Sequence, residues 1–204
     1  MFRILRFKKK ALHLFQKGEG FTIIELMVAV FVFVLVIITA TDIFVSMIRN
    51  QARALNRQEL LNQASYAVEY VSRALRMAVK AADTNCLSTA GSSYETTHVV
   101  SGVANGIKFI NHNNNDVCQE FYWDSSALAL EESKGGVIIP LIASDASNIK
   151  VDYFKAAVYG ETDSDTYQPR TTISMKFHIG DGVNQVIQQV QTTISQRNLD
   201  IQQP

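Results

Sequence analysis

An apolar run from Phe21 to Thr41 constrains this chain more than any other part of its sequence. The run reads FTIIELMVAVFVFVLVIITAT and contains a single charged residue, Glu25. A helix of this length spans about 30 Å at 1.5 Å per residue, which is enough to cross the hydrocarbon of a bilayer. We therefore expect one membrane-spanning helix near the N-terminus.

Basic residues are concentrated ahead of this run. Residues 1–20 contain six of the 19 basic residues and one of the 19 acidic residues, so 13 basic and 18 acidic residues remain in 21–204. By the positive-inside tendency, the N-terminus is cytoplasmic and the rest of the chain is exported. The net charge of the whole chain is zero, so composition does not predict a nucleic-acid partner.

Three interpretations account for a basic segment followed by an apolar run. A secretory signal peptide would be cleaved near Ile38-Thr39-Ala40, but a charged residue and a length above about 15 residues fit that class poorly. An uncleaved anchor explains the length and the charge asymmetry, but an ionised Glu25 in a membrane helix costs about 2.5 kcal/mol or more. The third interpretation explains the glutamate and depends on the residues around it.

The segment Lys17–Val30, KGEGFTIIELMVAV, resembles the class III signal of type IV pilins and type II secretion pseudopilins. The resemblance lies in a short basic leader, a glycine, an aromatic residue, and a glutamate four residues after that aromatic residue. It implies that a prepilin peptidase cuts between Gly20 and Phe21 and methylates the new amine of Phe21. It also implies that Glu25 is the glutamate through which subunits assemble.

The chemistry of Glu25 supports this resemblance. Cleavage before Phe21 creates a cationic amine at the start of a helix, one turn from Glu25. A carboxylate in the first helical turn is favoured by the helix dipole, and in a low dielectric it attracts an amine far more strongly than in water. In the family a neighbouring subunit offers this amine, which implies that Glu25 guides insertion into a filament. The alternative is a carboxyl group that is protonated near the lipid headgroups.

The helix is predicted to continue well beyond the membrane. No glycine or proline lies between Gly20 and Gly91, so no strong helix breaker interrupts it. Apolar residues recur at spacings of three and four, which indicates one packed face. This stripe consists of Leu61, Ala64, Val68, Val71, Leu75, Ala78 and Ala82. A helix from Phe21 to about Ala82 would be roughly 90 Å long, so lipid or other subunits must cover its first half. An anchor that continues into a signalling coiled coil is the alternative.

From Asp83 onward the apolar period changes from 3.6 to 2, which predicts a β-rich region. The predicted strands are Gly106–Ile110, Val117–Trp123, Val137–Leu141, Ile149–Phe154, Thr171–Ile179 and Gln185–Ser195. The last two form the clearest hairpin, because Gly180-Asp181-Gly182 lies between them. One face of the sheet is expected to pack on the helical stripe. The expected fold class is therefore α+β, a long N-terminal helix on a C-terminal antiparallel sheet, as in a pilin head.

These patterns divide the chain into three parts. Residues 1–20 form the leader that the peptidase removes, and residues 21–52 form the half of the helix that lies in the membrane or in the filament core. Residues 53–204 form the exported head. Within the head, an amphipathic half-helix at 53–82 precedes a β-rich part at 83–204.

Two further segments, Val190–Leu199 and Glu69–Val79, are similar to those of the larger minor subunits in this superfamily, the J-type pseudopilins and minor pilins. The resemblance implies a minor subunit that initiates or caps a filament. Its expected partners are other subunits, the inner-membrane assembly platform and the lipid bilayer. Before assembly it would lie in the inner membrane with its head in the periplasm or outside the cell. The alternative is an uncleaved single-pass protein whose exported head is a binding or sensory module.

Cys86 and Cys118 are the only cysteines, and both lie in the exported part. An oxidising compartment permits a disulfide between them, which would close a loop of about 30 residues and contribute about 3 kcal/mol. Two free thiols are the alternative. Two cysteines so far apart do not indicate a metal site.

Signals for catalysis or for a bound ion are weak. The sequence has no phosphate-binding loop, dinucleotide fingerprint or nucleophile-elbow motif, so neither an enzyme nor a cofactor is predicted. Glu161, Asp163 and Asp165 alternate as calcium ligands do, but the glycine and the distal glutamate of a calcium loop are missing. We therefore expect a solvated acidic turn there, no metal, and no direct contact with nucleic acid.

Overall fold

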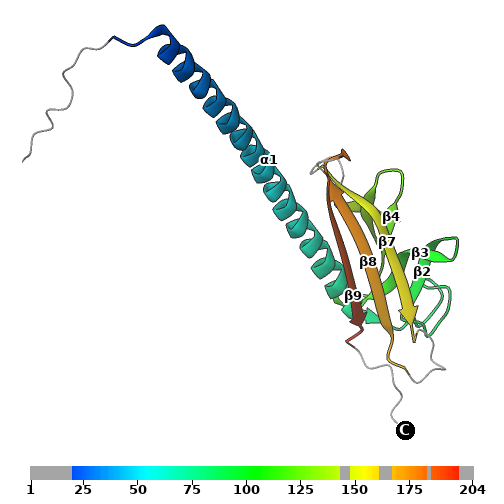
Figure 1. Ribbon diagram of the computed structural model, residues 1–204. Coiled ribbons are helices and arrows are strands. Elements are labelled where there is room, and N and C mark those ends of the chain that lie inside the picture. The colour runs from blue at the N-terminus through cyan, green and yellow to red at the C-terminus, as the bar shows by residue number, and fades with distance from the viewer. Residues whose placement is uncertain (1–19, 143–147, 161–166, 183–184, 198–204) are drawn as a thin grey trace, which may run out of the picture. The chain divides into compact units, whose positions relative to one another are not determined.

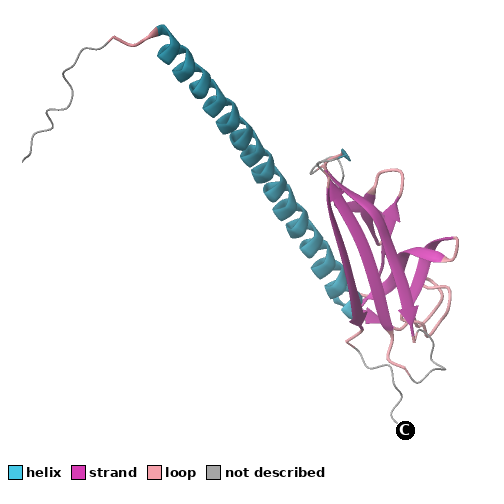
Figure 2. Ribbon diagram, in the orientation of Figure 1, coloured by secondary structure: helices cyan, strands magenta, loops and turns pink. Residues whose placement is uncertain are grey.

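The computed structural model describes residues 20–142, 148–160, 167–182 and 185–197 of the chain. It contains one long helix followed by a single antiparallel sheet of nine strands (Figures 1 and 2), which confirms the predicted α+β class. The elements are α1 (Ile23–Arg76), β1 (Ala78–Val79), β2 (Tyr94–Val100), β3 (Val103–Asn111), the 3₁₀ turn η1 (His112–Asn114), β4 (Val117–Asp124), β5 (Ala129–Lys134), β6 (Val137–Ile142), β7 (Ile149–Tyr159), β8 (Arg170–Ile179) and β9 (Val186–Ser195). The chain forms two compact units, Met1–Arg49 and Asn50–Pro204, which are described separately.

The first unit contains the apolar half of α1. Every residue from 20 to 55 is exposed to solvent, including all of the large apolar side chains in this range. The hydroxyl groups of Thr39 and Thr41 donate to the carbonyl oxygens of Val36 at 2.9 Å and Ile37 at 2.8 Å, so the helix itself satisfies them. By its length and composition α1 is able to cross a membrane once, as a single-pass protein requires.

The second unit contains the sheet, whose strand order is β6-β5-β4-β3-β7-β8-β9. β1 and β2 pair with β3 outside this path. All pairings are antiparallel. The three longest strands, β7, β8 and β9, lie side by side (Figure 1).

The predicted C-terminal hairpin is confirmed. β8 and β9 pair with Ile179 opposite Val186 and Met175 opposite Val190. On β8 the alternate residues from Thr171 to Ile179 are buried, and β9 alternates between more buried and more exposed positions. The alternation of apolar and polar residues in the sequence therefore correctly predicts which face of this hairpin is buried.

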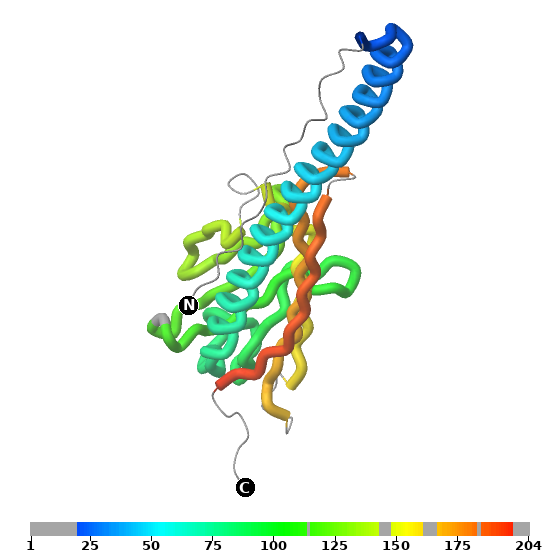
Figure 3. Tube along the Cα trace, turned by 60° about the vertical axis from the view of Figure 1, so that its left-hand side comes forward, coloured from blue at the N-terminus to red at the C-terminus, as the bar shows by residue number. Residues whose placement is uncertain are grey.

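The half of α1 in the second unit buries one side against the sheet (Figure 3). Its buried residues are Leu60, Ala64, Ala67, Val71, Ala74 and Leu75. They share one core with large rings from the sheet, among them Phe109, Phe121 and Phe177. Because alanine side chains are short, these rings can fill the space next to the helix.

The predicted stripe on this helix is wrong at both ends. Leu61 is 40% exposed whereas Leu60 is fully buried, so the packed face is displaced by one residue in this turn. Ala82 is exposed and lies after the helix. The middle of the stripe, from Ala64 to Leu75, is confirmed.

The predicted end of the helix, near Ala82, is also wrong, because α1 ends at Arg76. Carbonyl groups at this end accept hydrogen bonds from distant parts of the second unit. Leu75 O accepts from Tyr94 Oη at 2.8 Å, Arg76 O from Arg197 N at 2.8 Å, and Met77 O from His112 N at 3.1 Å. The last carbonyls of a helix need such outside partners, and the chain continues as β1, which pairs with β3.

All six predicted strands are present, and β7 extends beyond the predicted end to Tyr159. β1, β2 and β5 were not predicted. β5 has the sequence ALEESK, in which glutamate and lysine have low β-propensity. One of its glutamates, Glu132, is buried, so the apolar alternation that would have identified this strand is interrupted.

The predicted disulfide is confirmed. Cys86 and Cys118 are bonded, with Cα atoms 5.6 Å apart. The bond ties the loop between β1 and β2 to the start of β4.

We predict that residues 53–204, expressed alone in an oxidising compartment, fold as a soluble protein. The cut removes no buried side chain among the described residues, and the core belongs to the second unit. Circular dichroism and urea unfolding should show a cooperative transition. The intact mass should be two hydrogen atoms below that of the reduced chain.

A fragment that begins at Ala78 is the control, because it lacks the helix that covers the sheet. It should not give a cooperative transition. An unfolded 53–204 fragment would show that the head needs the apolar half of α1.

Candidate assembly site

The residues that the sequence assigns to processing lie at the exposed start of α1. Gly20 and Phe21 precede the helix in non-helical backbone, and Phe21 is 76% exposed. A Cβ atom added to Gly20 would meet no atom within 4 Å. The described part of the chain thus leaves this peptide bond accessible, and it tolerates a larger side chain at residue 20.

Thr22 caps the first turn of α1. Its Oγ1 accepts a hydrogen bond from Glu25 N at 3.3 Å, and its carbonyl oxygen accepts one from Leu26 N at 3.1 Å. Threonine followed three residues later by glutamate is the order of a capping box, a signal that our sequence analysis missed. The cap fixes where the helix begins, and it therefore places Glu25 in the first turn.

The Glu25 carboxylate has no hydrogen bond or ion pair with any described residue. The side chains one turn away from it, those of Phe21 and Val28, are apolar and exposed. An unpaired carboxylate in lipid raises the free energy of membrane insertion. A cation brought by another molecule would offset this cost, and the helix dipole at this end favours the negative charge.

A buried polar cluster links α1 to the sheet in the second unit. Tyr70 Oη of α1 lies 3.1 and 3.0 Å from the two carboxylate oxygens of Glu132 on β5. Gln119 on β4 donates to the same carboxylate at 2.5 Å, and Asn111 on β3 donates to Gln119 at 2.7 Å. Glu132, Gln119 and Asn111 are each at most 3% exposed. One chain of hydrogen bonds therefore joins four elements of the fold.

Tyr70 is held in its neutral form in this cluster. Burial, together with the hydrogen bond to Glu132, raises the pKa of Tyr70 from its ordinary value of 10.0 to about 12. Tyr70 therefore remains a hydrogen-bond donor throughout the physiological pH range. Glu132 depends on such donors, because a buried polar group that loses its partner costs about 1–3 kcal/mol.

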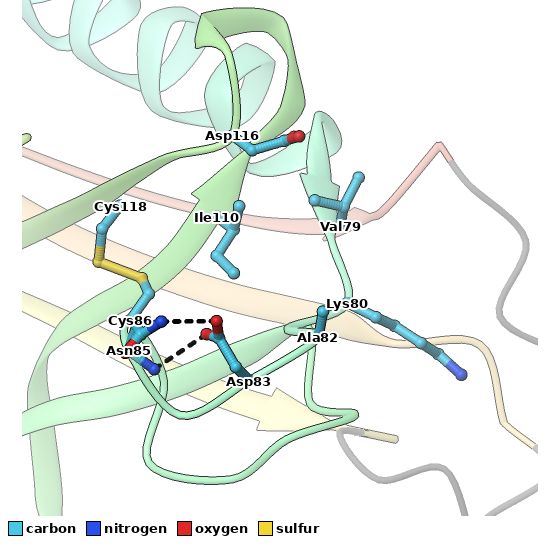
Figure 4. Close-up of a pocket in the computed structure, with 9 residues that line it drawn as sticks. All are labelled: Val79, Lys80, Ala82, Asp83, Asn85, Cys86, Ile110, Asp116 and Cys118. Carbon is cyan, nitrogen blue, oxygen red and sulfur yellow. Dashed lines mark hydrogen bonds between the residues drawn. A yellow bond between two sulfur atoms is a disulfide. The ribbon is translucent and has the colours of Figure 1, made fainter.

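The disulfide forms part of the wall of an open cavity of about 400 Å³ (Figure 4). Asp83 lines this cavity, but its carboxylate accepts hydrogen bonds from Asn85 N at 3.0 Å and Asn85 Nδ2 at 2.5 Å. Asp116, which also lines it, lies 2.9 Å from His112 Nδ1. Both carboxylates thus have partners. No group of three histidine, cysteine, aspartate or glutamate side chains in the described ranges is placed to share a metal ion.

Two predictions from the sequence concern residues whose structure is not described. The calcium candidate, Glu161, Asp163 and Asp165, lies outside the described residues, as does the leader before Gly20. Calcium binding and cleavage of the leader therefore stay predictions.

No protein-family model, no curated protein and no solved structure matches the chain. The function is therefore inferred from the start of α1 and from the fold of the second unit.

We predict that Tyr70→Phe lowers the free energy of unfolding of the 53–204 head by about 1.5–3 kcal/mol, because Glu132 loses a hydrogen bond to its charged group. Urea unfolding followed by circular dichroism measures this change. The matched control is Tyr66→Phe, since Tyr66 is 53% exposed and stacks on Tyr70 with ring centroids 6.0 Å apart. The control should change the same quantity by less than about 0.5 kcal/mol. Equal losses in the two variants would show that the Glu132 bond contributes nothing.

Proposed function

We propose that this chain is a structural subunit of a type IV pilus-like or type II secretion pseudopilus filament. The observation that carries the proposal is the Glu25 carboxylate, which has no partner among the described residues and lies in the first turn of an exposed apolar helix. An accessible Gly20–Phe21 bond directly before the cap is consistent with it. So is the long helix packed on an antiparallel sheet.

In this proposal the inner-membrane prepilin peptidase cleaves after Gly20 and methylates the amine of Phe21. The amine of an incoming subunit then pairs with Glu25 of a subunit that is already in place. A charge-assisted hydrogen bond of this kind is strong in lipid, where little water competes for either group. Because the pairing requires both groups at one depth in the membrane, it sets the register of insertion.

The exposed apolar side chains of the first unit supply the remaining contacts. In the bilayer they are covered by lipid, and in the filament they would be covered by the helices of other subunits. The head would follow the helix, because the carbonyls at the end of α1 and Tyr70 are hydrogen-bonded to the sheet. In this role the chain needs no catalytic residue and no cofactor.

We further propose a minor subunit that initiates or caps the filament, working with other subunits and the inner-membrane assembly platform. This assignment rests on the resemblance of Glu69–Val79 and Val190–Leu199 to minor subunits. Quantification of the chain in isolated filaments tests it, because a minor subunit should be far less abundant than the main subunit.

We predict that, in a cell with the matching peptidase, the mature chain begins at Phe21 and carries a methyl group on its amine. Mass spectrometry of the N-terminal peptide of the native protein measures both changes. Gly20→Leu should block cleavage, because the peptidase must approach the backbone closely there, whereas the matched change Gly18→Leu should be tolerated. Membrane protein that always retains Met1 would favour the uncleaved single-pass alternative.

We predict that Glu25→Val still inserts into the membrane but co-purifies with neighbouring subunits at least about tenfold less well, which corresponds to about 1.4 kcal/mol. Insertion is retained because the change removes a costly charge from an apolar helix. Asp42→Val is the control, since it removes the other acidic residue within residues 21–48. Normal recovery of Glu25→Val with its neighbours would contradict the role of the glutamate.

A further inference from the structure

Three arginines line one groove where α1 ends. Arg73 and Arg76 lie in the last turn of α1, and Arg197 follows β9. Together with Met77 and Ser195 they line a cavity of about 450 Å³. The end of β9 lies beside the last turns of α1 (Figure 3), and Arg197 N donates to Arg76 O at 2.8 Å. The backbone thus holds the two segments of the groove together.

Two of these guanidinium groups have no carboxylate partner in the part of the chain that the structure describes. Arg73 forms an ion pair with Glu69, one turn earlier on α1. Arg76 and Arg197 are exposed and form no ion pair with any described residue. An anion in the groove would be attracted by Arg76 and Arg197, whereas Glu69 offsets the charge of Arg73.

Stabilisation of the end of α1 explains why two of the three arginines lie at the groove, but not why the third does. Basic residues in the last turn interact favourably with the helix dipole, which accounts for Arg73 and Arg76. It does not account for Arg197, which comes from the end of a strand. The carbonyls of Leu75 and Arg76 already accept hydrogen bonds from Tyr94 and from the backbone of Arg197. The Arg197 side chain is therefore not needed to stabilise the helix end and is available to a ligand from outside.

We propose that this groove binds an acidic segment of a partner protein. The planar guanidinium group of arginine binds a carboxylate through two parallel hydrogen bonds. Met77 and the aliphatic stems of the arginines provide apolar surface for the rest of such a segment. This inference does not depend on the filament function proposed above.

Nucleic acid fits the surroundings of the groove less well. Arg170 of β8, which pairs with Ser195, already places its guanidinium group over the Tyr159 ring, 4.5 Å from the centroid. Farther along the sheet, Lys150 and Lys176 are each already paired with an aspartate, at 3.5 and 3.2 Å. Residues 21–204 contain 13 basic and 18 acidic residues, so a long polyanion would extend from a small basic patch over a protein of net negative charge. A short acidic segment avoids this repulsion.

The test uses the full chain in a neutral detergent and a fluorescently labelled peptide in which glutamate and leucine alternate. At low salt the fluorescence anisotropy should rise to saturation, and a peptide with glutamine in place of glutamate should not bind. Arg197→Gln should weaken binding at least about tenfold. Arg197→Lys should have an intermediate effect, because it keeps the charge but loses the planar fork.

Arg57→Gln is the matched control. It makes the same change of charge at an exposed position of α1 outside the groove, and it should alter the affinity less than about twofold. Thermal unfolding by circular dichroism checks that each variant is folded. If Arg197→Gln does not fold, Arg76→Gln provides the same test on the opposite wall.

Three results would overturn the proposal. The first is no saturable binding of the acidic peptide to the unaltered chain. The second is an equal loss of affinity in Arg57→Gln, which would indicate attraction to charge in general. The third is tighter binding of a labelled single-stranded oligonucleotide that is lost in Arg197→Gln, which would assign the groove to nucleic acid.

Discussion

The last carbonyl groups of α1 accept hydrogen bonds that the helix cannot make within itself, and the rest of the head is arranged around them. Tyr94 and Arg197 supply the donors to Leu75 O and Arg76 O, and His112 donates to Met77 O directly after the helix. These donors are far apart in the sequence. Since the helix ends at Arg76, the next residues are free to form β1 and to pair with β3. The same contacts bring the end of β9 to the end of the helix, where the arginine groove forms.

The contacts between the helix and the sheet are of two kinds with different effects. Small and apolar side chains from Leu60 to Leu75 provide burial, which is favourable but is not sensitive to direction. The bond from Tyr70 to Glu132 and its continuation to Gln119 and Asn111 is directional and buried. Each member of such a network that is left unpaired costs free energy, so the network favours the position of the helix on the sheet that satisfies all of them.

The two halves of α1 differ in how much of their surface is buried. In the second unit one side of the helix is buried, whereas every residue of the helix up to Leu55 is exposed. An exposed apolar helix of this length needs lipid or other helices, and its one acidic residue near the start needs a cation. The proposed filament would supply both, and the proposal rests on this match rather than on a catalytic motif.

The sequence by itself determined the features that depend on local pattern. The apolar run predicts the exposed helix, and alternation with a glycine-containing turn predicts the β8–β9 hairpin. Two cysteines in a segment that we expect to be exported predict the disulfide. The cap at Thr22 could also have been predicted, because Thr22 and Glu25 are three residues apart, as in a capping box. Only the tertiary structure decided where α1 ends, that Glu132 is buried in a strand, and that Arg197 joins Arg73 and Arg76. Each of these depends on a partner brought from far along the chain, and neither residue spacing nor net charge records which distant residues will meet.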